Sequence, residues 1–160
     1  PPCFNDTPTP ELNTARYTLS LHDALPICCI FIVDDDPITV FGIKKMLKSV
    51  AECDDIQIFQ NCHEAHEALN ERNNTGGTIP EVIFLDINMP IMDGWEFLDA
   101  MIELDIKEQI VINMITSSID PLDHKKWAEF KDRCPYPLHF KNKPIFKIES
   151  NDLGCMEIAS

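Results

Sequence analysis

The sequence predicts an α/β protein with a doubly wound, five-stranded parallel sheet and helices on both faces. Apolar runs alternate with helical patterns from Cys28 onward, as expected of right-handed β-α-β units. The runs Cys28–Val33 and Val82–Leu85 contain no polar residue, which is typical of strands covered on both faces. Polar residues follow directly after the expected strands, at the edge where parallel sheets bind their ligands.

The elements are expected in a regular order, with strands at 28–33, 56–59, 82–85, 110–115 and, more weakly, 138–140. Pro37 begins the first helix, because a proline at the first helical position loses no hydrogen bond. Asn61, with Glu64 three residues later, forms a capping box for the second helix. Asp93 caps the third helix, and Asp120 precedes the proline that begins the fourth. The first helix has one apolar stripe, formed by Val40, Ile43, Leu47 and Val50.

The chain divides into three segments by pattern. Residues 1–27 have no usable periodicity, and residues 17–27 resemble one translated frame of a common sequencing adapter. We therefore predict that 1–27 is a non-native or disordered segment, in which no function is assigned to His22 or Asp23. Residues 28–150 are expected to form the domain, and 151–160 a short tail or frayed last helix.

Composition excludes several function classes. The 160 residues include 27 Asp and Glu against 13 Lys and Arg, for a net charge of −14. This balance argues against nucleic acid or an anionic membrane as a partner, since both need clustered basic residues.

The seven cysteines are scattered without a C-x-x-C pair, which favours a reducing cytoplasm. His63 and His66 lie three residues apart, but a zinc site needs more ligands, so we favour a solvated helix face.

Chemistry-bearing residues gather at the expected strand ends. Asp34 and Asp35 follow the first strand, Asp86 the third, Thr116 the fourth and Lys143 the fifth. Converging carboxylates repel one another, and an oxygen-only ligand set is what Mg²⁺ prefers. A metal-bound aspartate can also attack phosphorus as a nucleophile. A lysine and a hydroxyl would then neutralise the phosphoryl oxygens.

Residues 28 to about 146 resemble the receiver domain of two-component response regulators. The resemblance rests on Ile32–Pro37 with its three aspartates, Phe84–Pro90, Met92-Asp93-Gly94, Ile115-Thr116-Ser117 and Lys143-Pro144. It implies a flavodoxin-like fold with five strands and five helices. The polar fifth strand, Phe140-Lys-Asn-Lys143, leaves its register open, and Ser150-Asn-Asp and Gly154 interrupt the expected last helix.

The resemblance also implies roles for individual residues. Asp86 would be the phosphoacceptor, and Asp34, Asp35, Asp86 and the backbone carbonyl of Asn88 would hold Mg²⁺. Thr116 would be the switch hydroxyl.

Two further roles lie on the fifth strand and just after it. Lys143 would contact the phosphoryl group, and its bond to Pro144 would be cis. Phe140 would occupy the switch-aromatic position, although it has no hydroxyl.

The implied function is signalling rather than enzyme catalysis, beyond the domain's own phosphorylation and dephosphorylation. A sensor histidine kinase or a histidine phosphotransfer protein would donate the phosphoryl group, and a downstream protein would be the target.

Two alternatives remain. A haloacid-dehalogenase-like phosphatase also uses aspartate, hydroxyl, lysine and Mg²⁺, but Ile38 breaks its D-x-D-x-T/V signature and its acidic pair after Lys143 is absent. A degenerate receiver that acts only as an interaction module would need to have lost the phosphoacceptor or the acid pair, and Asp34, Asp35 and Asp86 are all present.

Overall fold

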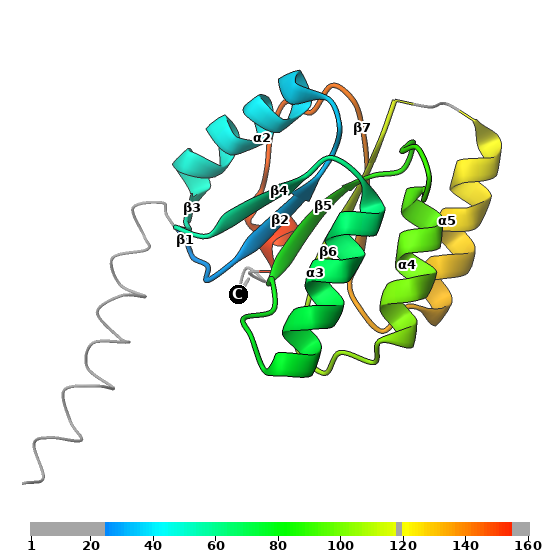
Figure 1. The fold of residues 1–160 in the computed structure, drawn as a ribbon. Coiled ribbons are helices and arrows are strands. Elements are labelled where there is room, and N and C mark those ends of the chain that lie inside the picture. Colours follow the sequence, from blue (N-terminus) through cyan, green and yellow to red (C-terminus); the bar gives the residue numbers. More distant parts are fainter. Residues whose placement is uncertain (1–24, 118–119, 155–160) are drawn as a thin grey trace, which may run out of the picture.

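The computed structural model describes residues 25–117 and 120–154, so most of the segment that resembles an adapter lies outside the described residues. A five-stranded parallel sheet forms the centre, with strand order β4-β2-β5-β6-β7 (Figure 1). The strands are β2 Ile30–Val33, β4 Ile56–Phe59, β5 Val82–Asp86, β6 Val111–Thr116 and β7 Leu138–Asn142. The first strand of this sheet along the chain, β2, therefore lies inside the sheet, and the winding direction reverses between β2 and β5, as the doubly wound class requires.

Four α-helices in the described residues connect the strands. They are α2 Pro37–Val50, α3 Cys62–Thr75, α4 Gly94–Glu103 and α5 Pro121–Arg133. The predicted caps are confirmed: Asn61 and Asp93 accept the amides of Glu64 and Glu96, each at 2.8 Å, and Asp120 caps α5. None of these helices has the length and apolar character needed to cross a bilayer.

The helices form one layer on each face of the sheet (Figure 1). Buried side chains of α3, α4 and α5 pack with Phe31, Ile83 and Ile112 on one face. Those of α2 pack with Ile32 and Phe84 on the other. Neighbouring strand residues alternate between these two cores, which explains why β2 and β5 are apolar at every position before Asp86.

The folded part begins slightly earlier than predicted. Strand β1, Leu25–Pro26, pairs in parallel with β3, Ala51–Glu52. Ile27 is buried, and its amide donates to the carbonyl of Glu52 at 3.0 Å. The boundary expected at residue 28 therefore needs correction, because residues 25–27 are integrated into the fold.

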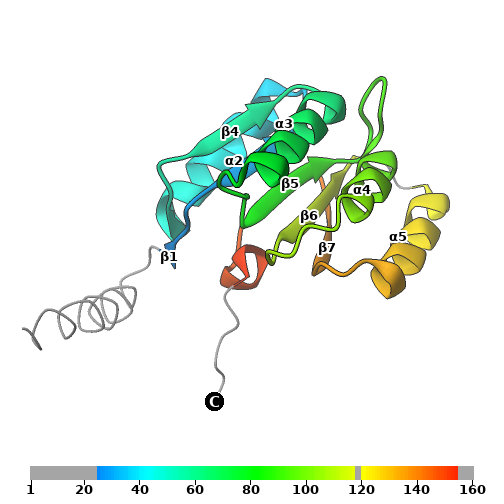
Figure 2. The ribbon, with the colours of Figure 1, turned by 60° about the horizontal axis from the view of Figure 1, so that its bottom comes forward.

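Where the fifth helix was expected, the described residues form irregular backbone and one 3-10 helix, Ser150–Leu153, which lies beside the sheet in Figure 2. Gly154 turns the chain there with a φ of 84°, a conformation that ends rather than extends a helix. Ile148, Asp152 and Leu153 are nevertheless buried. The tail predicted to start at residue 151 is therefore packed against the domain as far as Gly154, and residues 155–160 lie outside the described part.

The register of the last strand is now defined. Among the described strands, β7 pairs with β6 alone, from Ile112 opposite Leu138 to Thr116 opposite Asn142. An edge strand tolerates polar residues because it is only partly covered. This accounts for the lysine and asparagine that follow Phe140.

We predict that Gly94→Ala destabilises the protein. A Cβ atom at Gly94 would lie 2.8 Å from the Cα of Ile87 and 3.1 Å from the carbonyl oxygen of Asp86, so the backbone beside Asp86 would have to shift. We expect the free energy of unfolding to fall by about 1–3 kcal/mol, measured by urea denaturation.

The matched control is Gly42→Ala in the interior of α2, where a Cβ would have no neighbour within 4 Å. This change should raise the free energy of unfolding by about 0.5–1 kcal/mol through the unfolded state. Equal effects of the two substitutions would contradict the packing described for Gly94.

Candidate functional site

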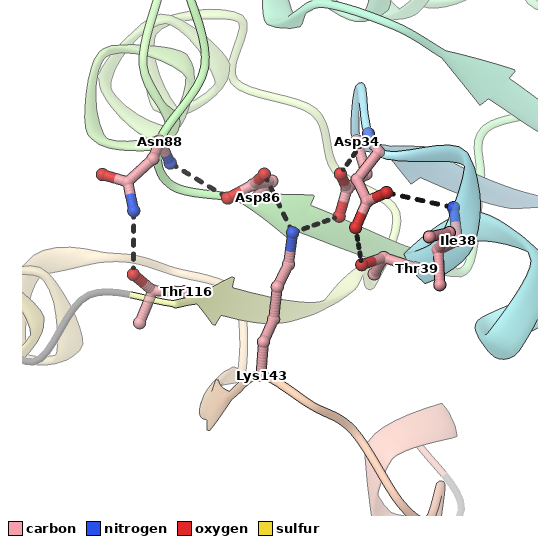
Figure 3. A network of polar contacts seen from close by, with 8 residues as sticks. Asp34, Ile38, Thr39, Asp86, Asn88, Thr116 and Lys143 are labelled. Atoms are coloured by element: carbon pink, nitrogen blue, oxygen red, sulfur yellow. Dashed lines mark hydrogen bonds and ion pairs between the residues drawn. The ribbon is translucent and has the colours of Figure 1, made fainter.

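Most of the predicted site residues meet at the carboxyl ends of the strands, beside the point where the winding reverses. Figure 3 shows Asp34, Asp86, Asn88, Thr116 and Lys143 there. Asp34 follows β2, and Asp86 is the last residue of β5; both are buried, whereas Asp35 is exposed. Carboxylate oxygens from these three residues lie within 4.8 Å of one another. The structure therefore brings together the acidic cluster that the sequence predicts.

Asp34 is the most constrained of these acids, with an exposed fraction of 1%. Its Oδ1 accepts the backbone amide of Asp36 at 2.8 Å. Its Oδ2 lies 3.0 Å from Lys143 Nζ, but no described residue donates a well-oriented hydrogen bond to this oxygen. Burial, and to a lesser extent the negative charge of Asp86, raise the pKa of Asp34 to about 6. The hydrogen bond from the Asp36 amide and the charge of Lys143 lower this pKa but do not outweigh burial.

Lys143 supplies the positive charge between the two buried acids (Figure 3). Its Nζ donates to Asp86 Oδ2 at 3.2 Å, and its backbone amide donates to the carbonyl of Thr116 at 2.8 Å. Burial alone would lower the pKa of Lys143, but the ion pairs with the charges of Asp34 and Asp86, together with the hydrogen bond to Asp86, outweigh burial and raise the pKa. The peptide bond from Lys143 to Pro144 is cis, as expected.

Asn88 and Thr116 form the opposite side of the site. The backbone amide of Asn88 donates to Asp86 Oδ1 at 3.0 Å, and its side-chain amide donates to Thr116 Oγ1 at 3.1 Å. Thr116 is fully buried. The bridge through the Asn88 side chain was missed in the sequence, where only the backbone carbonyl of this residue was considered.

Asp36, the third acid of the run, has a different role. It accepts the amide of Ile38 at 3.1 Å and the hydroxyl of Thr39 at 2.7 Å, which makes it the N-cap of α2. These bonds lower the pKa of Asp36, with the Thr39 hydroxyl the largest cause. A helix cap and an acidic cluster therefore share one tri-aspartate run.

Phe140 lies outside the acidic cluster. Its ring centroid is 5.1 Å from that of His124 and 6.3 Å from that of Trp127, both on α5. It packs against the core on the α3–α5 face. The structure therefore places the predicted switch aromatic beneath α5, on the strand that leads to Lys143.

The two histidines of α3 do not form a metal site with other described residues. His63 pairs with Glu67 at 3.4 Å on an exposed helix face. Among the described residues, the only cluster with metal-ligand spacing is the one formed by Asp34, Asp35 and Asp86. This finding favours the interpretation of a solvated helix face.

The curated relatives match this chain over only part of their own length. A protein-glutamate methylesterase/protein-glutamine glutaminase from Methanococcoides burtonii is 34% identical over 94 residues, which are 58% of this chain and 25% of that protein. An uncharacterized response regulatory protein from Shewanella oneidensis is 35% identical over 85 residues, 53% of this chain and 33% of that protein. The chain thus spans only a quarter to a third of the length of these relatives.

Solved structures share the fold over most of the chain. A two-component response regulator from Cytophaga hutchinsonii has a TM-score of 0.62 at 29% identity and covers 81% of this chain and 92% of its own. A CheY-like receiver domain protein from Methanospirillum hungatei has a TM-score of 0.54 at 25% identity, with 79% and 87% covered. These likenesses confirm the predicted fold class.

The family model described as the response regulator receiver domain matches residues 30–130, more than half of the chain. The phosphatase alternative receives no support from any of these matches. The matched range contains the acids at the ends of β2 and β5 and the hydroxyl at the end of β6. The chain therefore belongs to the response regulator receiver family of two-component signalling.

Proposed function

We propose that the domain accepts a phosphoryl group on Asp86 from a phosphohistidine of a sensor kinase or a phosphotransfer protein. The observation that carries this proposal is the placement of Asp86, whose carboxylate lies beside two other acids and within 3.2 Å of Lys143 Nζ. Family membership supplies the class of donor. A response to phosphorylation in an unidentified downstream protein is part of the same proposal.

We further propose that Asp34, Asp35, Asp86 and the backbone carbonyl of Asn88 hold Mg²⁺. The donor set fits this ion: three carboxylates converge within 4.8 Å, and one buried oxygen of Asp34 has an ion-pair contact but no hydrogen bond from the described residues. When bound, Mg²⁺ would relieve the repulsion between the acids and stabilise charge on the phosphoryl oxygens.

The residues of the chain suit an in-line transfer. A carboxylate oxygen of Asp86 forms the new bond to phosphorus, while the bond from phosphorus to the donor's histidine nitrogen breaks and that nitrogen keeps the electron pair. Lys143 already donates to Asp86 and would transfer this hydrogen bond to a phosphoryl oxygen. The Thr116 hydroxyl, held by Asn88 at 3.1 Å, would contact another.

The first test is the site of phosphorylation. Incubation with acetyl phosphate and Mg²⁺ should add one phosphoryl group by intact mass, and hydroxylamine should remove it because an acyl phosphate is labile. Asp86→Asn should abolish the adduct. Asp99→Asn, at an exposed acid paired with Arg133 on the neighbouring helix, should leave it unchanged. Persistence of the adduct in Asp86→Asn, or its absence from the unmodified protein, would contradict the proposal.

The second test separates two effects of Asp34: the loss of stability caused by its buried charge, and its contribution to Mg²⁺ binding. Its pKa is raised from 3.8 to about 6, so the folded state binds this proton more tightly than the unfolded state. Metal-free protein should therefore lose stability as the pH rises from about 4 through about 6 and keep the full penalty above that. Asp34→Asn should lack this contribution and melt higher than wild type at pH 7.5 without metal.

With Mg²⁺ bound, the wild type should instead melt at a higher temperature than Asp34→Asn. Mg²⁺ should raise the melting temperature of the wild type much more than that of Asp34→Asn. Calorimetric titration should show the affinity reduced by about tenfold or more, since even outer-shell partners contribute that much at metal sites. Equal stabilisation of both proteins by Mg²⁺ would remove Asp34 from the ligand set.

A further inference from the structure

In the described part of the chain, the 3-10 helix Ser150–Leu153 and not an α-helix contacts β6 and β7 on one face of the sheet, and Figure 2 shows it beside the sheet. Leu138 and Phe140 face the α3–α5 core, so strand alternation directs His139 and Lys141 to the opposite face. In the paired register, Asn113 of β6 lies beside His139 and is fully buried. This face therefore presents three polar side chains where apolar cover would normally pack.

Asp152 of the 3-10 helix meets this polar surface. Its side chain is 6% exposed, and its Oδ2 lies 2.9 Å from Lys141 Nζ. The same oxygen accepts the amide of Glu149 at 2.8 Å, and Oδ1 lies 4.0 Å from His139 Nδ1. A buried carboxylate is costly unless it is paired, and Asp152 is paired with the edge strand.

The backbone of Asp152 makes a second connection. Its carbonyl accepts the side-chain amide of Asn113 at 2.8 Å. One residue thus contacts both β6 and β7. The polar residues of the last strand and the acid of the 3-10 helix are complementary, so the segment after the cis bond belongs to the packing of β7.

We propose that Asp152 is a positioning residue for Lys143. Within the residues that the structure describes, β7 has a hydrogen-bonded strand on one side only, and Lys141 lies two residues before the lysine that contacts Asp34 and Asp86. The ion pair of Lys141 with Asp152 fixes the position of the end of β7. It thereby keeps Lys143 within reach of Asp34 and Asp86. The effect on phosphorylation rests on the proposed function, whereas the effect on strand order does not.

The first experiment measures strand order in the full chain without any phosphodonor. Amide hydrogen exchange of Lys141 and Lys143 should be faster in Asp152→Asn than in wild type, on the order of tenfold. Glu149→Gln is the matched control, because it neutralises an exposed acid of the same segment, paired with Lys147 at 3.1 Å. Unchanged exchange in Asp152→Asn would overturn the proposal, whatever the fate of the proposed function.

The second experiment asks whether Asp152 acts through Lys143. Asp152→Asn should slow phosphorylation by acetyl phosphate on the order of tenfold, while Glu149→Gln should not. In a Lys143→Met background, adding Asp152→Asn should change the remaining rate by less than about twofold. A general loss of stability would slow both backgrounds equally, and that result would overturn the positioning role.

A further variant distinguishes loss of the ion pair from misfolding of Asp152→Asn. Lys141→Met removes the other partner of the pair and should reproduce both effects in a folded protein. Normal exchange and a normal phosphorylation rate in Lys141→Met would overturn the proposal. Absence of any phosphoryl adduct in the wild type would instead count against the proposed function, and the exchange result would still decide the positioning of β7.

Discussion

The contact of one lysine with two buried carboxylates is the interaction around which the site is organised. Asp34 and Asp86 end neighbouring strands, and Lys143 Nζ lies 3.0 and 3.2 Å from them. Without the lysine, two negative charges would face each other across buried backbone, at a cost of several kcal/mol for close pairs. The parallel sheet imposes this proximity, because it brings the carboxyl ends of its strands to one edge.

Much of this arrangement was predictable because local patterns and topology agree. The apolar runs before Asp34 and Asp86 predict buried strands, and the caps Asn61, Asp93 and Asp120 mark where helices begin. A parallel sheet then places Thr116 and Lys143 beside the acids. Asp36 shows the limit of such reasoning: three adjacent aspartates look equivalent in sequence, but only the backbone turn decides which one caps α2.

The errors lie where long-range contacts replace a regular pattern. Residues 25–27 lack periodicity, and their pairing with Ala51–Glu52 depends on strands distant in sequence. The segment after Lys143 reads as an interrupted helix, yet Asp152 is buried by Lys141 and Asn113. The polar residues of the last strand and the 3-10 helix after it are therefore complementary, because within the described residues an ion pair between them replaces part of the apolar packing.

We propose that Asp86, rather than another acid of the cluster, receives the phosphoryl group. Peptide mapping by mass spectrometry after brief labelling with acetyl phosphate and Mg²⁺, with borohydride reduction of the acyl phosphate, would test it most directly. We predict that the reduced residue is Asp86 alone. Reduction at Asp34 instead would make the carboxylate after β2 the nucleophile and would contradict the account.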